Sequence, residues 1–336
     1  MRPAIRNLGL AGFGVMRRLR LPNRAYAVLL YHRVVERREN GDSLVPGGSV
    51  DLYSFREQMN YVRRCCKVIE IGELCERISN AAPPDDFYVS ISFDDGYKTT
   101  YDTAVPILQG SGIPSAFFLT TGLVDQTVVP MWDSWPFMIS TINTPIELKL
   151  RGPLSERYDL RQEAEKRRLM SRLTVVVAQD PDMREDLHGV LAQMAEVECL
   201  PRFFINWEEA RTLSEMQGIT IGAHSVSHGA FGYNGEAMKK EMAASRDILH
   251  VRLGREIHFY AYPFGTKRRL KGSLYQEAEK AGFRAAFTAL EGYNRPGQNP
   301  FLLRRIPILG EEPLDPFITR LRMADFLGHV KNAKCG

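Results

Sequence analysis

Short apolar runs alternate along the chain with segments of helical spacing. Residues 26–35 (YAVLLYHRVV) and 87–93 (FYVSISF) are apolar and rich in β-branched or aromatic residues, which predicts two buried strands. Apolar residues three and four positions apart predict a helix over residues 54–64. A second helix is expected over residues 99–109, with Gly110 as its C-terminal cap. The first third of the chain is therefore predicted to alternate between strands and helices.

The same alternation continues after residue 205. Asn206 and Glu209 have the spacing of a capping box, which predicts the start of a helix. Further strands are expected at residues 68–69, 115–119, 219–223, 257–261, 285–288 and 303–308, and further helices at residues 236–253 and 273–281. Such alternation predicts an α/β fold with a largely parallel sheet, and roughly seven strands favour a distorted (β/α) barrel over an open sheet.

The pattern changes between residues 126 and 202. An aromatic patch, MWDSWPF at residues 131–137, comes before two charged segments of helical character at residues 161–177 and 183–197. We interpret residues 126–202 as a mainly helical insertion into a main domain that spans residues 25–310. Residues 311–336 are expected to form a C-terminal helical tail.

Composition adds one feature, a basic N-terminus. The chain has 336 residues, of which 44% are hydrophobic and 25% charged, as in ordinary globular proteins. Residues 1–24 contain six arginines and no acid, and their apolar stretch, residues 8–16, is much shorter than the about 20 residues that span a bilayer. It also lacks a signal-peptide cleavage site. We interpret residues 1–24 as a basic arm, either in peripheral contact with an anionic membrane surface or simply frayed, and expect a cytoplasmic protein or one on the cytoplasmic membrane face.

Two classes of site are disfavoured by the composition. The cysteines are odd in number, two are adjacent and no pair has zinc-finger spacing, so neither a disulfide framework nor a cysteine-metal site is expected; they are Cys65, Cys66, Cys75, Cys199 and Cys335. The arginines of the arm are not accompanied by a nucleic-acid-binding motif, so no nucleic-acid partner is expected.

Four candidate features stand at the predicted carboxyl ends of strands, where ligand sites gather in parallel α/β folds. Each has a simpler interpretation by itself, because Asp-Asp-Gly and Pro-Phe-Gly form turns and single histidines are commonly surface or half-buried residues. Their shared position favours one common site. The four are His32, the pair Asp94–Asp95, the pair His224 and His228, and the segment 263–265.

These side chains suit metal-assisted hydrolysis. Two histidines and one carboxylate form a ligand set that catalytic zinc uses, with positions left for water and substrate. A metal ion makes a bound water acidic enough to attack at neutral pH, and a second carboxylate can act as its general base. The cation also relieves the repulsion between Asp94 and Asp95.

Three motifs in this order resemble the polysaccharide deacetylases that carry the NodB homology domain (carbohydrate esterase family 4). They are SFDDGY at residues 92–97, GAHSVSHGAF at 222–231 and AYPFG at 261–265, and the likeness extends over residues 25–125 and 203–310. The resemblance implies that Asp94 is the catalytic base that activates a metal-bound water. It implies that Asp95, His224 and His228 bind the metal, with zinc expected and nickel or cobalt as alternatives.

The sequence departs from the family pattern at two positions. The arginine that usually orients the base is replaced by Ala261, and the usual Leu-x-His motif has no histidine in its counterpart at residues 303–306. Arg304 and Arg305 are both candidates to replace the missing arginine. The Tyr-His motif at residues 31–32 resembles a subgroup that includes enzymes acting on bacterial exopolysaccharides, and we expect His32 to act as acid or as an orienting partner.

Aromatic residues near the predicted site could bind a sugar, because flat apolar rings with polar edges match sugar faces. Core packing is the alternative for each ring. The candidates are Tyr97, Trp132, Trp135, Tyr262 and Phe264, joined by Asp133 and Pro263.

The resemblance implies a hydrolase that removes acetyl groups from N-acetylated sugars of a polysaccharide or glycolipid. An O-acetyl esterase acting on a polysaccharide could use the same site, because an ester is easier to cleave than an amide. A carbohydrate-binding pseudoenzyme is a further alternative, given the two departures from the family pattern.

Overall fold

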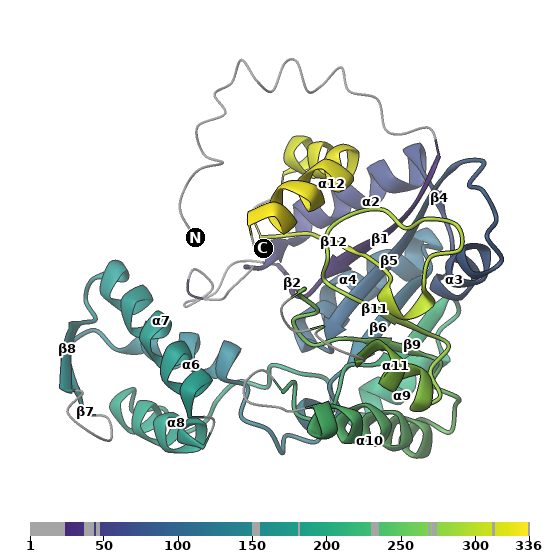
Figure 1. Ribbon diagram of the computed structural model, residues 1–336. Helices are drawn as coiled ribbons and strands as arrows, with labels where there is room; N and C mark the ends of the chain where they lie inside the picture. The colour runs from purple at the N-terminus through teal and green to yellow at the C-terminus, as the bar shows by residue number, and fades with distance from the viewer. Residues whose placement is uncertain are drawn as a thin grey trace.

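A parallel sheet curls through the centre of the larger part of the molecule in the computed structural model (Figure 1). The structure describes residues 24–36, 44, 48–149, 155–180, 182–229, 235–267, 270, 274–310 and 313–334. The predicted basic arm, except for Arg24, lies outside the described residues, as does Cys335.

Every strand of the central sheet pairs in parallel with its neighbours. The strands follow the order β11 (Ala285–Phe287), β10 (Phe259–Ala261), β9 (Ile219–Ala223), β6 (Ser115–Leu119), β5 (Phe87–Asp95), β1 (Ala25–Tyr31) and β12 (Ile306–Pro307), and β4 (Lys67–Val68) pairs with β5 beside this path. Leu303, just before β12, forms a parallel bridge with Phe287 of β11, and its N–H donates to the Ala286 carbonyl at 3.1 Å. The two ends of the sheet therefore meet through this segment, and the prediction of a distorted barrel of about seven strands is confirmed.

Helices pack around the barrel because each buries one apolar face. In α2 (Leu52–Cys65), Phe55, Met59 and Val62 are buried at helical spacing, and Asp51 caps the start by accepting the Ser54 N–H at 2.9 Å. The other described helices of this part of the molecule are α3 (Ile71–Ser79), α4 (Lys98–Ser111), α5 (Thr121–Val124), α9 (Trp207–Glu215), α10 (Gly235–Leu253), α11 (Leu274–Lys280), α12 (Leu314–Lys334) and the 3₁₀ turn η2 (Pro300–Leu302). Among the described residues, no helix combines the length and apolar character needed to cross a bilayer.

Two local predictions were wrong. The strand expected over residues 26–35 is divided, because the chain leaves the sheet after β1 and Val34 pairs separately, in β2 (Val34–Val35) with β3 (Val50–Asp51). The Thr100 hydroxyl hydrogen-bonds the backbone on both sides of Arg33, where the strand is interrupted: it donates to the His32 carbonyl at 2.8 Å and accepts the Val34 N–H at 3.0 Å. Helix α4 also runs past Gly110 to Ser111, and its C-terminal cap is Gly112, which adopts the left-handed conformation (φ 62°) that glycine tolerates best.

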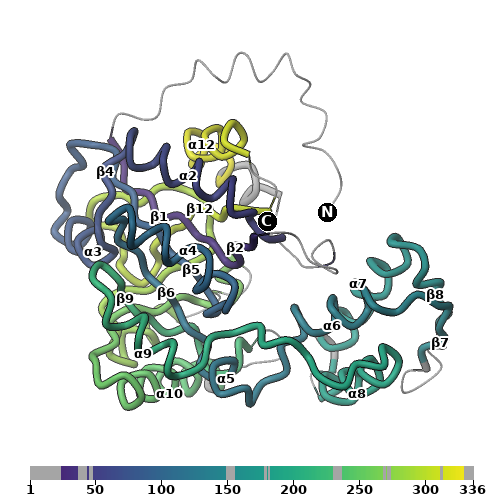
Figure 2. The backbone as a smooth tube through the Cα atoms, turned by 180° about the vertical axis from the view of Figure 1, so that it is seen from behind, coloured from purple at the N-terminus to yellow at the C-terminus, as the bar shows by residue number. Residues whose placement is uncertain are grey.

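Residues 131–194 form a group of elements that project to one side of the barrel in both views (Figures 1 and 2). They are α6 (Met131–Thr141), the antiparallel hairpin β7 (Pro145–Lys149) and β8 (Ser155–Asp159), α7 (Glu163–Gln179) and α8 (Met183–Met194). Their buried apolar residues, among them Trp135, Leu173 and Leu187, form a cluster separate from that of the barrel. We call residues 126–202 the insertion; it has an apolar core of its own.

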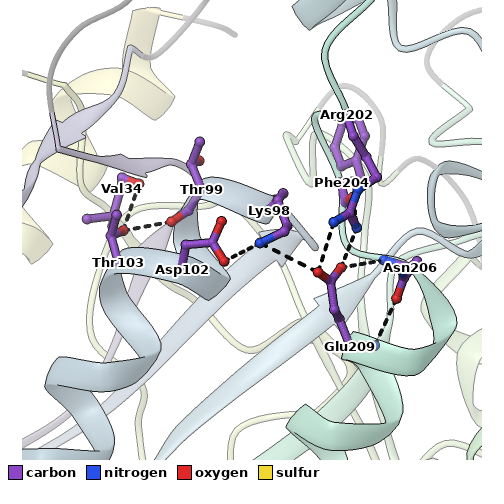
Figure 3. A network of polar contacts seen from close by, with 9 residues as sticks. All are labelled: Val34, Lys98, Thr99, Asp102, Thr103, Arg202, Phe204, Asn206 and Glu209. Atoms are coloured by element: carbon purple, nitrogen blue, oxygen red, sulfur yellow. Dashed lines mark hydrogen bonds and ion pairs between the residues drawn. The ribbon is translucent and has the colours of Figure 1, made fainter.

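The chain returns from the insertion through contacts with the start of α4, shown in Figure 3. Glu209 accepts from Arg202, whose Nη2 lies 2.9 Å away, and its carboxylate lies 3.5 Å from Lys98 Nζ. Glu209 also completes the predicted capping box with Asn206. The Lys98 N–H donates to the Phe203 carbonyl at 2.8 Å. The end of the insertion is thereby attached directly beside the segment that follows Asp95.

Candidate active site

Asp94 and Asp95 end strand β5 and open onto one cavity of about 240 Å³. Both are buried, with 3% and 6% of their surface exposed. On a regular strand, neighbouring side chains point to opposite faces. Asp95 has a φ of 74°, which a non-glycine residue rarely adopts, and Gly96 follows with a φ of 89°. This turn, which includes both Asp95 and Gly96, lets the two carboxylates line the same cavity.

Asp95, His224 and His228 form a cluster that could hold a metal ion. Their ligand atoms all lie within 4.8 Å of one another. Oδ1 of Asp95 lies 3.4 Å from Nε2 of His224 and 3.2 Å from Nε2 of His228. His224 follows β9, and His228 is reached through a turn in which Ser225 and His228 both have positive φ and the Ser225 hydroxyl accepts the His228 N–H at 3.0 Å.

The chemistry of these three side chains fits a divalent cation. Nδ1 of His224 lies 2.8 Å from the Ala261 carbonyl oxygen, so that nitrogen must donate and Nε2 keeps a lone pair for the cluster. Oδ1 of Asp95 is buried and makes no hydrogen bond to any described residue. A buried carboxylate oxygen without a donor is costly, and a cation would satisfy it.

The ionisation states of the cluster also suit a cation. Burial lowers the pKa of His224 to about 4 and outweighs the opposing effect of Asp94 and Asp95. Burial, together with the charge of His32, also lowers the pKa of His228 to about 4. Both imidazoles are therefore neutral at pH 7, which is the form that binds metals. Burial raises the pKa of Asp95, and a bound cation would reverse that shift.

Arg305 holds Asp94 in place. The Arg305 side chain is fully buried, and its Nη1 and Nη2 donate to the two carboxylate oxygens of Asp94 at 2.7 and 2.8 Å. Its Nε donates to the Thr288 carbonyl at 2.9 Å, which fixes the guanidinium plane. Burial has the largest single effect on the pKa of Asp94 and would raise it, but the charge and hydrogen bonds of Arg305, together with the charge of His224, outweigh burial and lower this pKa to about 2.

The sequence left Arg304 and Arg305 as equal candidates for this contact. In the structure, Nη1 of Arg304 donates instead to the Glu291 carbonyl at 3.3 Å, away from Asp94. Arg305 thus reaches the carboxylate from the segment before β12, while Ala261, at the position where the family usually has arginine, contributes only its carbonyl to His224.

His32 lies directly after β1, is exposed, and lines the same cavity as Asp94. Arg33, which the sequence analysis did not single out, also lines this cavity and is 5% exposed. Its Nη1 lies 4.0 Å from Oδ1 of Asp133 in α6. A single arginine carries no spacing signal, so only the fold identifies Arg33 as part of the site.

The predicted sugar-binding residues fall into two groups. Tyr97, Trp132, Asp133 and Phe264 lie together: the Tyr97 hydroxyl donates to Asp133 Oδ2 at 3.3 Å, and the Trp132 and Phe264 ring centroids are 6.2 Å apart. The ring centroids of Phe264 and His228 are 4.9 Å apart. The other three residues are buried. Tyr262 lines the cavity, but its hydroxyl donates to the Phe301 carbonyl at 3.1 Å. Pro263 is buried beside it, and Trp135 lies in the core of the insertion.

Comparison with solved structures shows that several of them share this fold. The Streptococcus pyogenes deacetylase PplD superposes with a TM-score of 0.58 at 15% identity, over 89% of this chain and 99% of that one. IcaB from Ammonifex degensii gives a TM-score of 0.58 at 17% identity, over 90% and 98% of the two chains. A de-N-acetylase from Aggregatibacter actinomycetemcomitans gives 0.54 at 15% identity, over 88% and 99%.

Sequence comparison identifies the family. Among curated proteins, none matches this chain significantly. The sequence profile described as polysaccharide deacetylase matches residues 81–286, more than half of the 336 residues, and this range includes Asp94, Asp95, His224 and His228. The chain is a member of the polysaccharide deacetylase family.

Proposed function

We propose that this protein is a metal-dependent carbohydrate deacetylase that removes acetyl groups from N-acetylated sugars of a polysaccharide or glycolipid. One observation carries the proposal. The buried cluster of Asp95, His224 and His228 lies beside a second carboxylate, Asp94, which Arg305 holds in a fixed orientation. A site that only bound sugar would need neither the three convergent ligands nor the second buried carboxylate.

Asp95 and the Nε2 atoms of His224 and His228 would hold the cation. When bound there, a divalent cation would acidify a water molecule and polarise the acetyl carbonyl. We expect zinc, because two histidines and one carboxylate are a common ligand set of catalytic zinc, with nickel or cobalt as alternatives.

The chain's own residues supply the proton transfers. Asp94 accepts a proton from the attacking water, and Arg305 keeps the carboxylate aimed at the cavity while it does so. The Tyr97 N–H, at the N-terminal end of α4, has no acceptor among the described residues and can donate to the developing oxyanion. His32, in the same cavity, delivers a proton to the departing amine, and acetate is released.

The cavity also suits a sugar ring. Trp132 and Phe264 are half-buried and expose part of their rings beside His228. Tyr97 adds a polar atom, and its hydroxyl donates to Asp133, which lines the smaller adjoining cavity. Half-buried aromatic rings with nearby polar groups suit pyranose rings, which have apolar faces and hydroxyl edges.

Two other functions would use the same residues. An O-acetyl esterase needs the same cluster and base. A carbohydrate-binding pseudoenzyme was suggested by the arginine missing at position 261 and the histidine missing from residues 303–306. Arg305 makes the contact with Asp94 from elsewhere in the chain, which removes the first of these two grounds. This contact favours an enzyme.

Acetate release tests the proposal. The zinc-loaded full chain should release acetate from N-acetylglucosamine oligomers, and treatment with a chelator should abolish this release until zinc is restored. Release from O-acetylated but not from N-acetylated sugars would identify an esterase. Zinc binding without release of acetate from either substrate would identify a binding protein.

A further inference from the structure

Arg184 is a cation on the insertion side of the candidate active site. It lies in the first turn of α8 and lines a small cavity together with Asp95, Trp132 and His228. Those three residues also line the larger cavity that contains Asp94. Arg184 is therefore next to the proposed catalytic centre although it comes from the insertion rather than from the barrel.

Arg184 differs from the other two arginines of these cavities in having no anionic partner within the part of the chain that the structure describes. Arg305 is paired with Asp94, and the guanidinium of Arg33 lies 4.0 Å from Asp133. Among the described residues, Arg184 makes no hydrogen bond or ion pair, and its Nε is buried without an acceptor. A buried donor without an acceptor costs free energy, and a ligand oxygen would recover that cost.

The remaining charges at the site leave a positive excess. The carboxylates that line the two cavities are Asp94, Asp95 and Asp133, and the arginines are Arg33, Arg184 and Arg305. Two of the carboxylates face arginines, and Asp95 belongs to the cation cluster. A divalent cation held by the Asp95 carboxylate and two histidines, which bind metals in their neutral form, would give the cluster one positive charge, and Arg184 adds another. An excess of this sign attracts an anionic substrate.

We propose that Arg184 binds an anionic group of the substrate, a carboxylate or a phosphate carried close to the acetylated sugar. This inference rests on the proposed deacetylase function and narrows its substrate to acidic glycans or phosphorylated glycolipids. The planar guanidinium can donate two parallel hydrogen bonds to either group, which gives affinity and orientation together. The barrel then provides the reacting groups, and the insertion selects the charge of the polymer.

Binding of matched neutral and charged ligands tests this role. The zinc-loaded full chain is titrated in a calorimeter with a neutral N-acetylglucosamine oligomer, with an oligomer that alternates N-acetylglucosamine and glucuronate, and with N-acetylglucosamine 1-phosphate. Wild-type protein should bind one of the two charged ligands about 10-fold to 100-fold more tightly than the neutral one, as expected for a hydrogen-bonded charge pair. Preference for the glucuronate oligomer identifies a carboxylate, and preference for the phosphate identifies a phosphorylated substrate.

Variants at Arg184 separate recognition from folding. Arg184→Gln should remove the preference and leave the affinity for the neutral oligomer within about twofold, while Arg184→Lys should retain part of it. Arg167→Gln is the matched control, because Arg167 is an exposed arginine of the insertion that pairs with Glu163. The same affinity for neutral and charged ligands in the wild-type protein, or equal weakening of both by Arg184→Gln, would overturn the proposal.

Acetate release, measured in parallel, distinguishes failure of this inference from failure of the proposed function. Acetate release without any effect of Arg184 on charge preference would refute the role of Arg184 and keep the deacetylase. An Arg184-dependent preference in binding, with no acetate released from any of the three ligands, would support the role of Arg184 and refute the deacetylase.

Discussion

The barrel and the insertion contribute different kinds of residue to the two adjoining cavities of the candidate site. Barrel residues come from the ends of parallel strands and are fixed by buried contacts, such as the pair of Arg305 with Asp94 and the hydrogen bond of His224 to Ala261. The insertion contributes Trp132, Asp133 and Arg184 from helices packed around a separate core. Because the rigid sheet orients the reacting groups and the insertion only borders them, we expect barrel mutations to affect turnover and insertion mutations to affect substrate binding.

The first prediction concerns the proposed base. Asp94→Asn should lower kcat by about 10³-fold, within the range attributed to a positioned general base, and should leave zinc content unchanged. Acetate release and metal analysis of the same preparation measure both effects. Loss of zinc together with activity would mean that Asp94, rather than Asp95, holds the cation.

The second prediction concerns the arginine that holds the base. Arg305→Met should lower kcat/KM by about 100-fold, because Asp94 would lose its fixed orientation. It should also move the acidic limb of the pH–rate profile to higher pH, since burial raises the pKa of Asp94 once the charge of Arg305 is gone.

Arg304→Met is the control for this experiment, because the Arg304 side chain points to the Glu291 carbonyl. Its kcat/KM should stay within about twofold of wild type. Loss of a buried partner destabilises a fold by about 3–5 kcal/mol, so circular dichroism must first show that Arg305→Met is folded at the assay temperature. An unchanged pH profile in folded Arg305→Met protein would contradict the role given to Arg305.

The third prediction compares the histidines of the two regions in metal-free protein. The folded pKa of His224 and His228 is about 4, whereas the ordinary value is 6.5. Between these values the unfolded chain takes up protons that the folded chain does not, so the free energy of unfolding falls as the pH is lowered from 6.5 to 4. The slope is at most about 1.4 kcal/mol per pH unit for each histidine.

Denaturant titrations from pH 7 to pH 4 with a chelator present measure this slope. Replacement of His224 and His228 together by Asn should remove most of it. His188→Gln, in the insertion, should remove little, because His188 is only half-buried and its pKa is lowered by that partial burial alone. A slope that is lost mainly in His188→Gln protein would contradict this prediction, because it would place the acid-sensitive histidine in the insertion and not in the barrel.

The fourth prediction compares two tryptophans of the same helix, α6. Trp132→Ala should raise KM by about tenfold with little change in Tm, because the half-buried ring borders the cavity. Trp135→Ala should instead lower stability by about 3–5 kcal/mol, because Trp135 is fully buried in the core of the insertion. Equal effects of the two substitutions on KM would contradict the assignment of Trp132 as a substrate contact and of Trp135 as a core residue.

Much of the barrel could be predicted from local patterns. The strands at residues 115–119 and 219–223 have the predicted bounds, because each is a short apolar run between turn residues. The capping box of Asn206 and Glu209 was likewise visible, since both partners lie within four residues. These features depend on neighbours along the chain, which is what a sequence pattern records.

The contacts made between distant segments could not be predicted. Arg305 and Asp94 are 211 residues apart, so no local pattern connects them. Residues 304–305 lie between the single β-bridge at Leu303 and the two-residue strand β12. This segment is too short for an alternation of apolar and polar residues to indicate which arginine faces the barrel. Arg184 is one charged residue among several on α8. Its significance comes from the position of the insertion beside the cavity, which the sequence does not encode locally.

Metal content measured on purified protein tests the central claim most directly. Wild-type protein loaded with zinc and dialysed should contain about one zinc ion per chain, because Asp95, His224 and His228 provide one ligand set. Asp95→Ala should lose this zinc while its circular dichroism spectrum stays that of a folded protein. Wild-type protein without zinc, or Asp95→Ala protein that retains the same amount, would contradict the assignment of the metal site.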